Sequence, residues 1–239
     1  MDNNLKHTVG EIVAKDFRTA SVFSKYGIDF CCGGNETLDE ACKKQSVDRI
    51  KLQNELDEAV QTGKEEVDFN SLPLDLLANY IEETYHTYIK KKSPYIIQFL
   101  GKIKEVHGEH HPELVNIFDL FSQSAMDLSM HLQKEERILF PLIRELAEAE
   151  RSGLFAEQSH CGTIQNPISV MKDEHEIEGA RFKKIAALSG GYTVPSDGCN
   201  TYHATYEMLE EFERKLHEHI HLENNILFPK AIELEKSFF

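Results

Sequence analysis

Two eleven-residue segments carry the same pattern of metal-binding side chains. HLQKEERILFP at 131–141 (the first copy) aligns without gaps with HIHLENNILFP at 219–229 (the second copy), 88 residues later. Six of the eleven positions are identical, and in each copy a Glu follows a His by four residues. Residues i and i+4 lie on one face of a helix, so imidazole and carboxylate can converge on one pair of metal ions. Repeated core packing would not require a His and a Glu at matching positions.

A lone histidine precedes each copy. His86 and His175 are 89 residues apart, so each half of the sequence supplies one His and then a His-x-x-x-Glu pair. Two His per metal and two shared carboxylates give each metal four protein ligands, and an oxo, hydroxo or water bridge would add a fifth. Mixed imidazole and carboxylate ligation suits iron or manganese, although zinc fits as well. The predicted ligands are His86, His131, Glu135, His175, His219 and Glu223.

A ferritin-type site is the nearest alternative. It uses Glu-x-x-His motifs, and Glu83 precedes His86 at this spacing, but Lys172 holds the matching place before His175 and cannot ligate. His107 lies 21 residues beyond His86. At ~1.5 Å per residue this is roughly 30 Å along one helix, so His107 cannot share the site.

Other side chains near the two copies compete for the ligand positions. His217, His219 and His221 alternate, so neighbours in this trio point to different faces of a helix. Only His219 has a Glu at i+4, and we therefore expect His217 and His221 at the surface or around the ligands. Glu136 rivals its neighbour in the first copy, but an Asn holds its place in the second.

Composition limits the classes of partner. The net charge of −15 disfavours nucleic acid, whose phosphates bind basic faces. The acidity suits cation handling, but plain solubility explains it better. No apolar run approaches the ~20 residues that span a bilayer, and the start of the chain lacks the pattern of a secretory signal. Five cysteines, two of them adjacent, form no spaced disulfide framework, so we expect a cytoplasmic protein.

The first part of the chain predicts a small helical domain at 1–62. Thr8 with Glu11, and Thr37 with Glu40, have the spacing of capping boxes that start helices. Between them, Gly27 is suited to end a helix and a Gly pair at 33–34 to form a turn. The polar stretch that follows predicts a linker at 63–71.

The remainder, 72–239, predicts an antiparallel four-helix bundle, in which facing side chains can build a metal site. Apolar periodicity continues past three prolines inside these segments, and there we expect kinks and not ends. The segments run from Pro73 to His107, Pro112 to Arg151, Gln165 to Leu188 and Asp197 to Lys236, and the prolines are Pro94, Pro141 and Pro229.

Together these residues resemble the hemerythrin-like iron–sulfur cluster repair di-iron proteins, the repair-of-iron-centres family. GIDFCCGG at 27–34 resembles the N-terminal signature of the family. YH at 85–86, HGEHHPEL at 107–114, the two copies and CNTY at 199–202 resemble its bundle. The resemblance covers nearly the whole chain. It implies an all-α fold, with a small N-terminal helical domain before a hemerythrin-like four-helix bundle, and two non-haem irons bridged by the two predicted carboxylates.

The resemblance also implies repair of iron–sulfur clusters after nitrosative or oxidative damage, by delivering iron or by reducing nitric oxide at the di-iron site. Nitric oxide or oxygen species would be the small ligands, and damaged iron–sulfur proteins the clients. Nitric oxide reductase activity, the client, the electron donor and a homodimer stay open. The alternative is a hemerythrin-like oxygen or iron carrier. It is less favoured because true hemerythrins place an extra His on one metal, whereas the repeat here yields equal halves.

Cys31 and Cys32 lie in a Gly-rich turn before the helix expected to open at Thr37. A helix N-terminus lowers the pKa of a nearby thiol, so the pair could transfer electrons, accept iron or oxidise. Packing under the turn is the alternative, and the family resemblance favours a catalytic role. A closed zinc site is disfavoured because it needs four ligands. We expect the other cysteines, Cys42, Cys161 and Cys199, to be structural or incidental.

Overall fold

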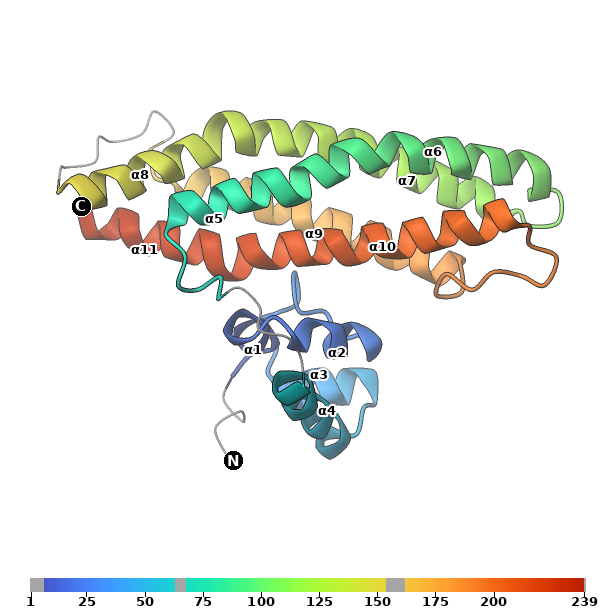
Figure 1. Cartoon of the computed structure of the whole chain (residues 1–239), viewed down its shortest axis with the longest axis horizontal. Coiled ribbons are helices and arrows are strands. Elements are labelled where there is room, and N and C mark those ends of the chain that lie inside the picture. Colours follow the sequence, from blue (N-terminus) through green and yellow to red (C-terminus); the bar gives the residue numbers. More distant parts are fainter. Residues whose placement is uncertain (1–6, 63–67, 154–161, 239) are drawn as a thin grey trace. The chain divides into compact units, whose positions relative to one another are not determined.

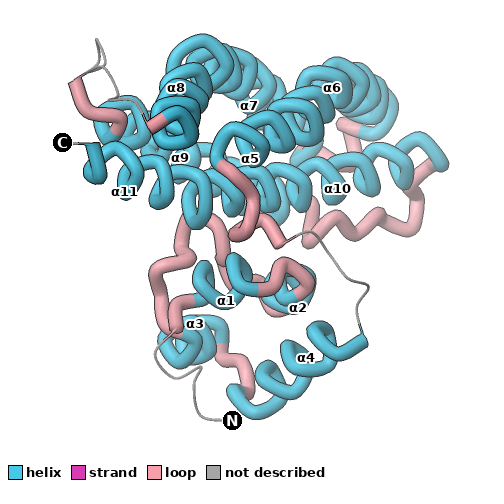
Figure 2. The backbone as a smooth tube through the Cα atoms, turned by 60° about the vertical axis from the view of Figure 1, so that its left-hand side comes forward, coloured by secondary structure: helices cyan, strands magenta, loops and turns pink. Residues whose placement is uncertain are grey.

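The computed structural model describes residues 7–62, 68–153 and 162–238. Within these ranges the named secondary-structure elements are helices, and an isolated antiparallel bridge joins Thr8 to Thr37 (Figures 1 and 2). The predicted all-α class is therefore confirmed. Among the described helices, none combines the length and the apolar character that crossing a membrane requires. The prediction for Cys161 concerns a residue outside the described ranges. Residues 63–67, which are most of the predicted linker, also lie outside them.

The described residues group into two compact units. One is drawn from Met1–Ala78, Ile143–Gln165 and His217–Phe239, and the other from Asn79–Leu142 and Asn166–Leu216. The predicted boundaries of the domains, 1–62, 63–71 and 72–239, stay predictions.

The second unit is an antiparallel four-helix bundle (Figure 1). Its helices are α6 (Thr87–His107), α7 (Glu113–Lys134), nearly all of α9 (Gln165–Leu188), and α10 (Asn200–Leu222) as far as Leu216. Phe121, Phe182 and Phe212 are fully buried in its core, with ring centroids 5.2 to 6.2 Å apart. Burying each such side chain contributes ~1.5–3 kcal/mol, and edge-to-face pairs add ~0.5–1.5 kcal/mol. These aromatic contacts keep the helices at the separation that the site needs.

Three of the four long helical runs contain a five-residue π segment. η2 (Glu82–His86) joins α5 (Leu74–Ile81) to α6, η3 (Glu135–Leu139) joins α7 to α8 (Phe140–Ser152), and η4 (Glu223–Leu227) joins α10 to α11 (Phe228–Phe238). Such segments are rare, and they are frequent at functional sites. The four runs match the predicted segments closely, and the third matches at both ends.

Proline explains two of the π segments. A proline lacks the backbone N–H and its ring clashes with the carbonyl four residues earlier. For Pro141 and Pro229 that carbonyl belongs to Arg137 and Asn225, which lie inside η3 and η4, where the wider turn relieves the clash. The helix also continues through Pro94. Helix continuation at all three prolines is thus confirmed, whereas kinks stay predictions.

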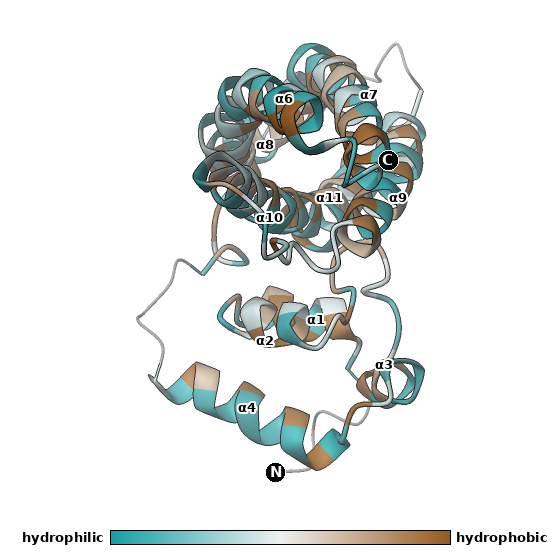
Figure 3. Ribbon diagram, turned by 90° about the vertical axis from the view of Figure 1, so that its right-hand side faces the viewer, coloured by the Kyte–Doolittle hydropathy of each residue, from teal (hydrophilic) through white to brown (hydrophobic). Residues whose placement is uncertain are grey.

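The first unit contains the short helices α1 (Val9–Lys15), α2 (Thr19–Lys25), α3 (Leu38–Gln45) and α4 (Arg49–Thr62). Both predicted capping boxes are present: the Glu11 and Glu40 backbone N–H groups donate to Thr8 and Thr37, and their carboxylates accept in return. Gly27 follows α2 with φ of +64°, the left-handed geometry predicted for a helix end. Apolar and polar residues alternate along α4 (Figure 3), which buries Leu52 and Leu56.

Candidate metal centre

The six predicted ligands come together as two overlapping groups. His86, Glu135, His219 and Glu223 form one, and the other contains His131 and His175 with the same two carboxylates. Within each group, the potential ligand atoms all lie within 4.8 Å of one another. Each of the six residues is at most 3% exposed. Glu135 and Glu223 belong to both groups, so the two groups overlap at these two carboxylates.

The individual separations suit metal ligation. The Nε2 atoms of His86 and His131 lie 3.4 and 3.3 Å from the two carboxylate oxygens of Glu135, and Nε2 of His219 lies 2.9 Å from Glu223 Oε1. Nε2 of His131 lies 3.1 Å from Nε2 of His175. Ligands that bind one ion at ~2.0–2.2 Å are about 3 Å from each other, so little movement would be needed to accept a cation.

The π segments position these side chains. His86 ends η2, Glu135 begins η3 and Glu223 begins η4, whereas His175 lies within the regular helix α9. A π turn contains more residues than an α turn, and it changes the direction of the side chains that follow. The sequence signalled two of these segments through the prolines, but their π geometry was not predicted.

Two further carboxylates orient the imidazoles. Nδ1 of His86 lies 2.9 Å from Glu136 Oε1, and Nδ1 of His131 lies 2.8 Å from Glu174 Oε2. Lys90 donates to Glu136, and Lys134 donates to Glu174. A carboxylate on Nδ1 fixes the ring orientation of a metal-binding His and directs Nε2 toward the metal. Both carboxylates therefore lie where outer partners of a metal site are found.

The pKa values fit this role. The hydrogen bond with His131 is the largest cause that lowers the pKa of the Glu174 carboxyl. Burial opposes it and Lys134 adds to it, and together they bring the pKa to about 2. Burial raises the pKa of Glu136, but hydrogen bonds with Lys90 and His86 outweigh it and keep the value below the usual range. From the sequence, Glu136 was considered only as a rival ligand, and Glu174 was not predicted. Both residues lie directly beside a predicted ligand in the sequence, and this position could have identified them as outer partners.

The donor set fits cations. Four neutral imidazoles and two carboxylates carry a charge of −2, and burying two carboxylates is costly unless cations pair with them. The same donors suit iron, manganese or zinc. What the arrangement offers chemically is a buried, anionic set of donors that could hold a metal cation.

The vicinal Cys31 and Cys32 belong to the first unit, and both are thiols. Their Sγ atoms are 3.8 Å apart, and Asp29 Oδ1 accepts hydrogen bonds from the backbone N–H groups of Cys31 and Cys32 and from the Cys31 thiol. The neighbouring Cys32, burial and Asp29 raise the pKa of Cys31 well above its usual value. The lowered pKa that a helix N-terminus would give is therefore not found at Cys31, because the Cys32 thiol, burial and the Asp29 carboxylate all raise it.

The other histidines divide between the two units. His221 was expected at the surface or around the ligands, and its full burial excludes the surface position. Burial also lowers its pKa to about 4. His217 is half-buried, with its ring 6.4 Å from that of Phe30. His107 belongs to neither ligand group, as predicted, and its Nε2 lies 3.2 Å from Sγ of Cys199.

Cys199 is exposed at the start of α10. The hydrogen bond with His107, together with the backbone N–H groups of Tyr202 and Thr201, lowers the pKa of its thiol to about 7. A low pKa and exposure are the conditions for thiol reactivity. The expectation that Cys199 is incidental missed this pairing, whose signal was a Cys at a helix start.

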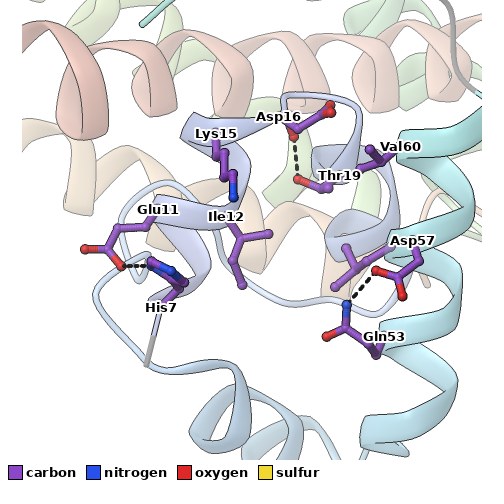
Figure 4. A pocket seen from close by; sticks show the side chains of 10 residues that line it. His7, Glu11, Ile12, Lys15, Asp16, Thr19, Gln53, Asp57 and Val60 are labelled. Atoms are coloured by element: carbon purple, nitrogen blue, oxygen red, sulfur yellow. Dashed lines mark hydrogen bonds and ion pairs between the residues drawn. The ribbon is translucent and has the colours of Figure 1, made fainter. Parts of the chain in front are cut away.

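A cavity of about 470 Å³ lies in the first unit and is lined by residues between His7 and Val60 (Figure 4). Several of its polar groups bond to one another: His7 with Glu11, Gln53 with Asp57, and Thr19 with the Asp16 carbonyl. None of the predicted metal ligands lines it.

Known families match both parts of the chain. Residues 77–231, which include all six predicted ligands, match the hemerythrin HHE cation binding domain, and residues 5–60 match a domain of unknown function (DUF542). The fold and the His/Glu cluster thus define a hemerythrin-like cation-binding protein.

Curated relatives cover nearly the full chain. The iron-sulfur cluster repair protein ScdA of Staphylococcus haemolyticus is 33% identical over 93% of this chain and 96% of its own. The iron-sulfur cluster repair protein YtfE of Musicola paradisiaca is 33% identical over 94% and 96%, and YtfE of Yersinia pestis is 33% identical over 90% and 91%. The chain belongs to this family of iron–sulfur cluster repair proteins.

Proposed function

We propose that the chain holds two iron ions at His86, His131, Glu135, His175, His219 and Glu223 and uses them to repair damaged iron–sulfur clusters. The observation that carries the proposal is the pair of overlapping ligand groups, which have Glu135 and Glu223 in common. A carboxylate that belongs to both groups is suited to bridge two ions, and an oxo or hydroxo bridge would complete the pair. Family membership supports iron–sulfur proteins as the clients.

The protein's own residues have separate tasks in this proposal. When bound, the irons supply redox chemistry and a store of iron. Glu136 and Glu174 orient His86 and His131, and the buried apolar residues around the cluster exclude water. Iron delivery and reduction of nitric oxide both fit this division, with nitric oxide or oxygen species as the small ligands. We place the protein in the cytoplasm, with a helical domain at 1–62, a linker at 63–71 and the di-iron domain at 72–239.

Metal analysis of protein purified without oxygen tests the proposal. We expect two irons per chain and antiferromagnetic coupling between them. Gln133→Ala, an exposed change two residues from both His131 and Glu135, is the matched control and should leave the metal content unchanged. Zinc in place of iron, or a single metal per chain, would contradict the assignment.

A repair assay separates the two mechanisms. The iron-loaded protein is added to a [4Fe–4S] dehydratase inactivated by nitric oxide, and both the recovered activity and the iron left on the chain are measured. Loss of iron in proportion to recovery indicates delivery, whereas nitrous oxide with the iron retained indicates reduction. No recovery from fully loaded protein would contradict repair.

The proposed catalytic role of the thiols has its own variant. Cys31→Ser with Cys32→Ser should leave the iron content near normal, because the six predicted ligands do not include a thiol. Recovery of the damaged enzyme should fall. Unchanged recovery would limit these cysteines to packing.

A further inference from the structure

The second copy presents two opposite faces. His219 and Glu223 belong to the ligand groups, while His221 and Asn225 are offset from them by two residues. Two residues correspond to about 200° around a helix, so the second pair projects away from the ligands. His221 is nevertheless fully buried and Asn225 half-buried. The back of this ligand-bearing turn is therefore covered.

The Cys31 loop of the same unit covers this face. The Asn225 side-chain amide donates to the carbonyls of Phe30 and Cys31 at 3.3 and 3.4 Å. Nδ1 of His221 lies 3.3 Å from the Phe30 carbonyl and 3.0 Å from the Asn225 amide nitrogen. The Phe30 and Phe17 rings pack on the His221 ring, with centroids 5.6 and 5.8 Å away. Polar and aromatic contacts thus hold the loop at one place.

Two glycines make room for the Asn225 side chain. A Cβ at Gly10 would lie 2.7 Å from Asn225 Oδ1, and a Cβ at Gly34 would lie 2.7 Å from the Phe30 carbonyl and 3.1 Å from the Gly10 Cα. The Gly10 N–H donates to the Gly34 carbonyl at 2.8 Å. Helix α1 and the cysteine loop approach so closely that neither position accepts a side chain without displacement.

The repeat diverges on the covered face. The first copy has Gln133 and Arg137 where the second has His221 and Asn225, and both first-copy residues are exposed. The predicted ligands and the tetrapeptide Ile-Leu-Phe-Pro are retained in both copies. Contacts with the covering loop therefore explain the residue types His221 and Asn225, whereas metal ligation does not.

We propose that His221 and Asn225 form a latch that positions the Cys31 loop on the back of the ligand-bearing turn, so that metal binding controls access to the thiols. This proposal rests on the proposed function, which supplies the metal ion. Asn225 lies in η4, which Glu223 begins. A cation held by Glu223 fixes that turn and keeps the latch closed over the buried Cys31. Loss of the cation frees the turn, loosens Asn225 and exposes the thiol.

Alkylation by N-ethylmaleimide, mapped to each cysteine by mass spectrometry, tests the latch with the exposed Cys199 as an internal reference. The full chain is compared with ferrous iron bound and after chelation. In the wild type, Cys31 should react about tenfold faster or more without iron, because local opening governs access to a buried group. Equal rates in the two states would overturn the proposal.

A variant with His221→Gln and Asn225→Arg carries the residues that the first copy uses on an exposed face. Cys31 should react fast in this variant with or without iron, and Asn225→Ala provides the same test with a smaller change. The matched control, Gln133→His with Arg137→Asn, should behave as the wild type. A slow Cys31 in a folded latch variant overturns the proposal. The iron content of the wild type tests the proposed function separately. If the proposed function is wrong, the wild type will lack iron, but the alkylation rate of Cys31 in the latch variant will not change.

Discussion

The two copies share the features that would bind a metal and differ in what surrounds them. In both, a His and a Glu one turn apart belong to the ligand groups, a π segment begins at the Glu, and a proline follows that segment. The outward side chains of the first copy are exposed, whereas those of the second are covered by the cysteine loop. Identity between the copies thus follows the ligand positions and the π segment with its proline, whereas divergence follows the neighbouring parts of the chain.

One identical position does not follow this rule. Ile226 is 2% exposed in the second copy, but its counterpart Ile138 is 45% exposed in the first. Burial accounts for the isoleucine of the second copy only.

Replacing either shared carboxylate should have the largest effect. Glu135→Ala and Glu223→Ala each remove an anionic ligand from both proposed metal positions. Iron should therefore fall from two to about one per chain or fewer in both variants. This effect is larger than that of losing an outer partner, which typically weakens metal affinity ~10–100-fold. Metal analysis measures the loss, with Gln133→Ala as control. A silent change in one copy would break the equivalence of the two.

Removing the cover of the second copy should cost stability. Phe30 is buried against His221, and Phe30→Ala should lower the free energy of unfolding by ~3–5 kcal/mol. Arg137→Ala, on the exposed face of the first copy, should change it by only ~0.5 kcal/mol or less. Urea unfolding followed by circular dichroism measures both. Similar losses in the two variants would show that the faces are equally supported.

The outer carboxylates should have a smaller effect on the metal. Glu136→Gln and Glu174→Gln should each weaken iron affinity ~10–100-fold, because each leaves an imidazole less firmly oriented. Competition with a chelator gives the affinity, and Glu211→Gln, outside both ligand groups, serves as the control. Unchanged iron affinity would show that the two carboxylates only form ion pairs with the neighbouring lysines and do not support the metal site.

The pH dependence of Glu174 follows from its lowered pKa. The value falls from 4.5 to about 2, so its interaction with His131 and Lys134 stabilises the folded state fully above pH 4.5. That contribution is lost as the pH falls toward 2. The free energy of unfolding should therefore differ less between pH 5 and pH 2.5 in Glu174→Gln than in the wild type.

The smallest effect concerns the helix starts that precede the copies. The repeat offset aligns Cys199, before α10, with His111, before α7. Because the pKa of Cys199 is lowered to about 7, its alkylation rate should be half-maximal near pH 7. His107→Ala should move that midpoint toward the usual value of about 8.5. An unchanged midpoint would show that the helix start alone lowers the pKa.

Much of this molecule follows from local sequence patterns. Capping boxes depend on residues three apart, and the ligand pattern depends on a repeat with a fixed spacing, so both could be read without tertiary information. The ligand role of the six residues stays a prediction, although the structure brings them together. The roles of Glu174 and Asn225 depend on partners 43 and 195 residues away. No local pattern specifies such pairs.

The pKa of Cys31 was mispredicted for the same reason. The sequence shows a helix start beyond the Gly-rich turn, but the group that contacts the thiol is the side chain of Asp29, folded back against it. Charge effects at a thiol depend on distances of a few ångströms, and composition does not give these distances.

The π segments have a consequence for insertions and deletions. Three helical runs each widen where a predicted ligand ends or begins a π turn. A one-residue deletion there could be absorbed by reverting to α-helix, and the backbone would stay helical. Side chains beyond the deletion would keep their direction, because a π turn holds one residue more than an α turn. In η3 or η4, however, the widened turn that begins at the predicted ligand Glu would be lost, and the side chains within that turn would change direction. Selection on length at these three places would therefore act on chemistry before it acts on folding.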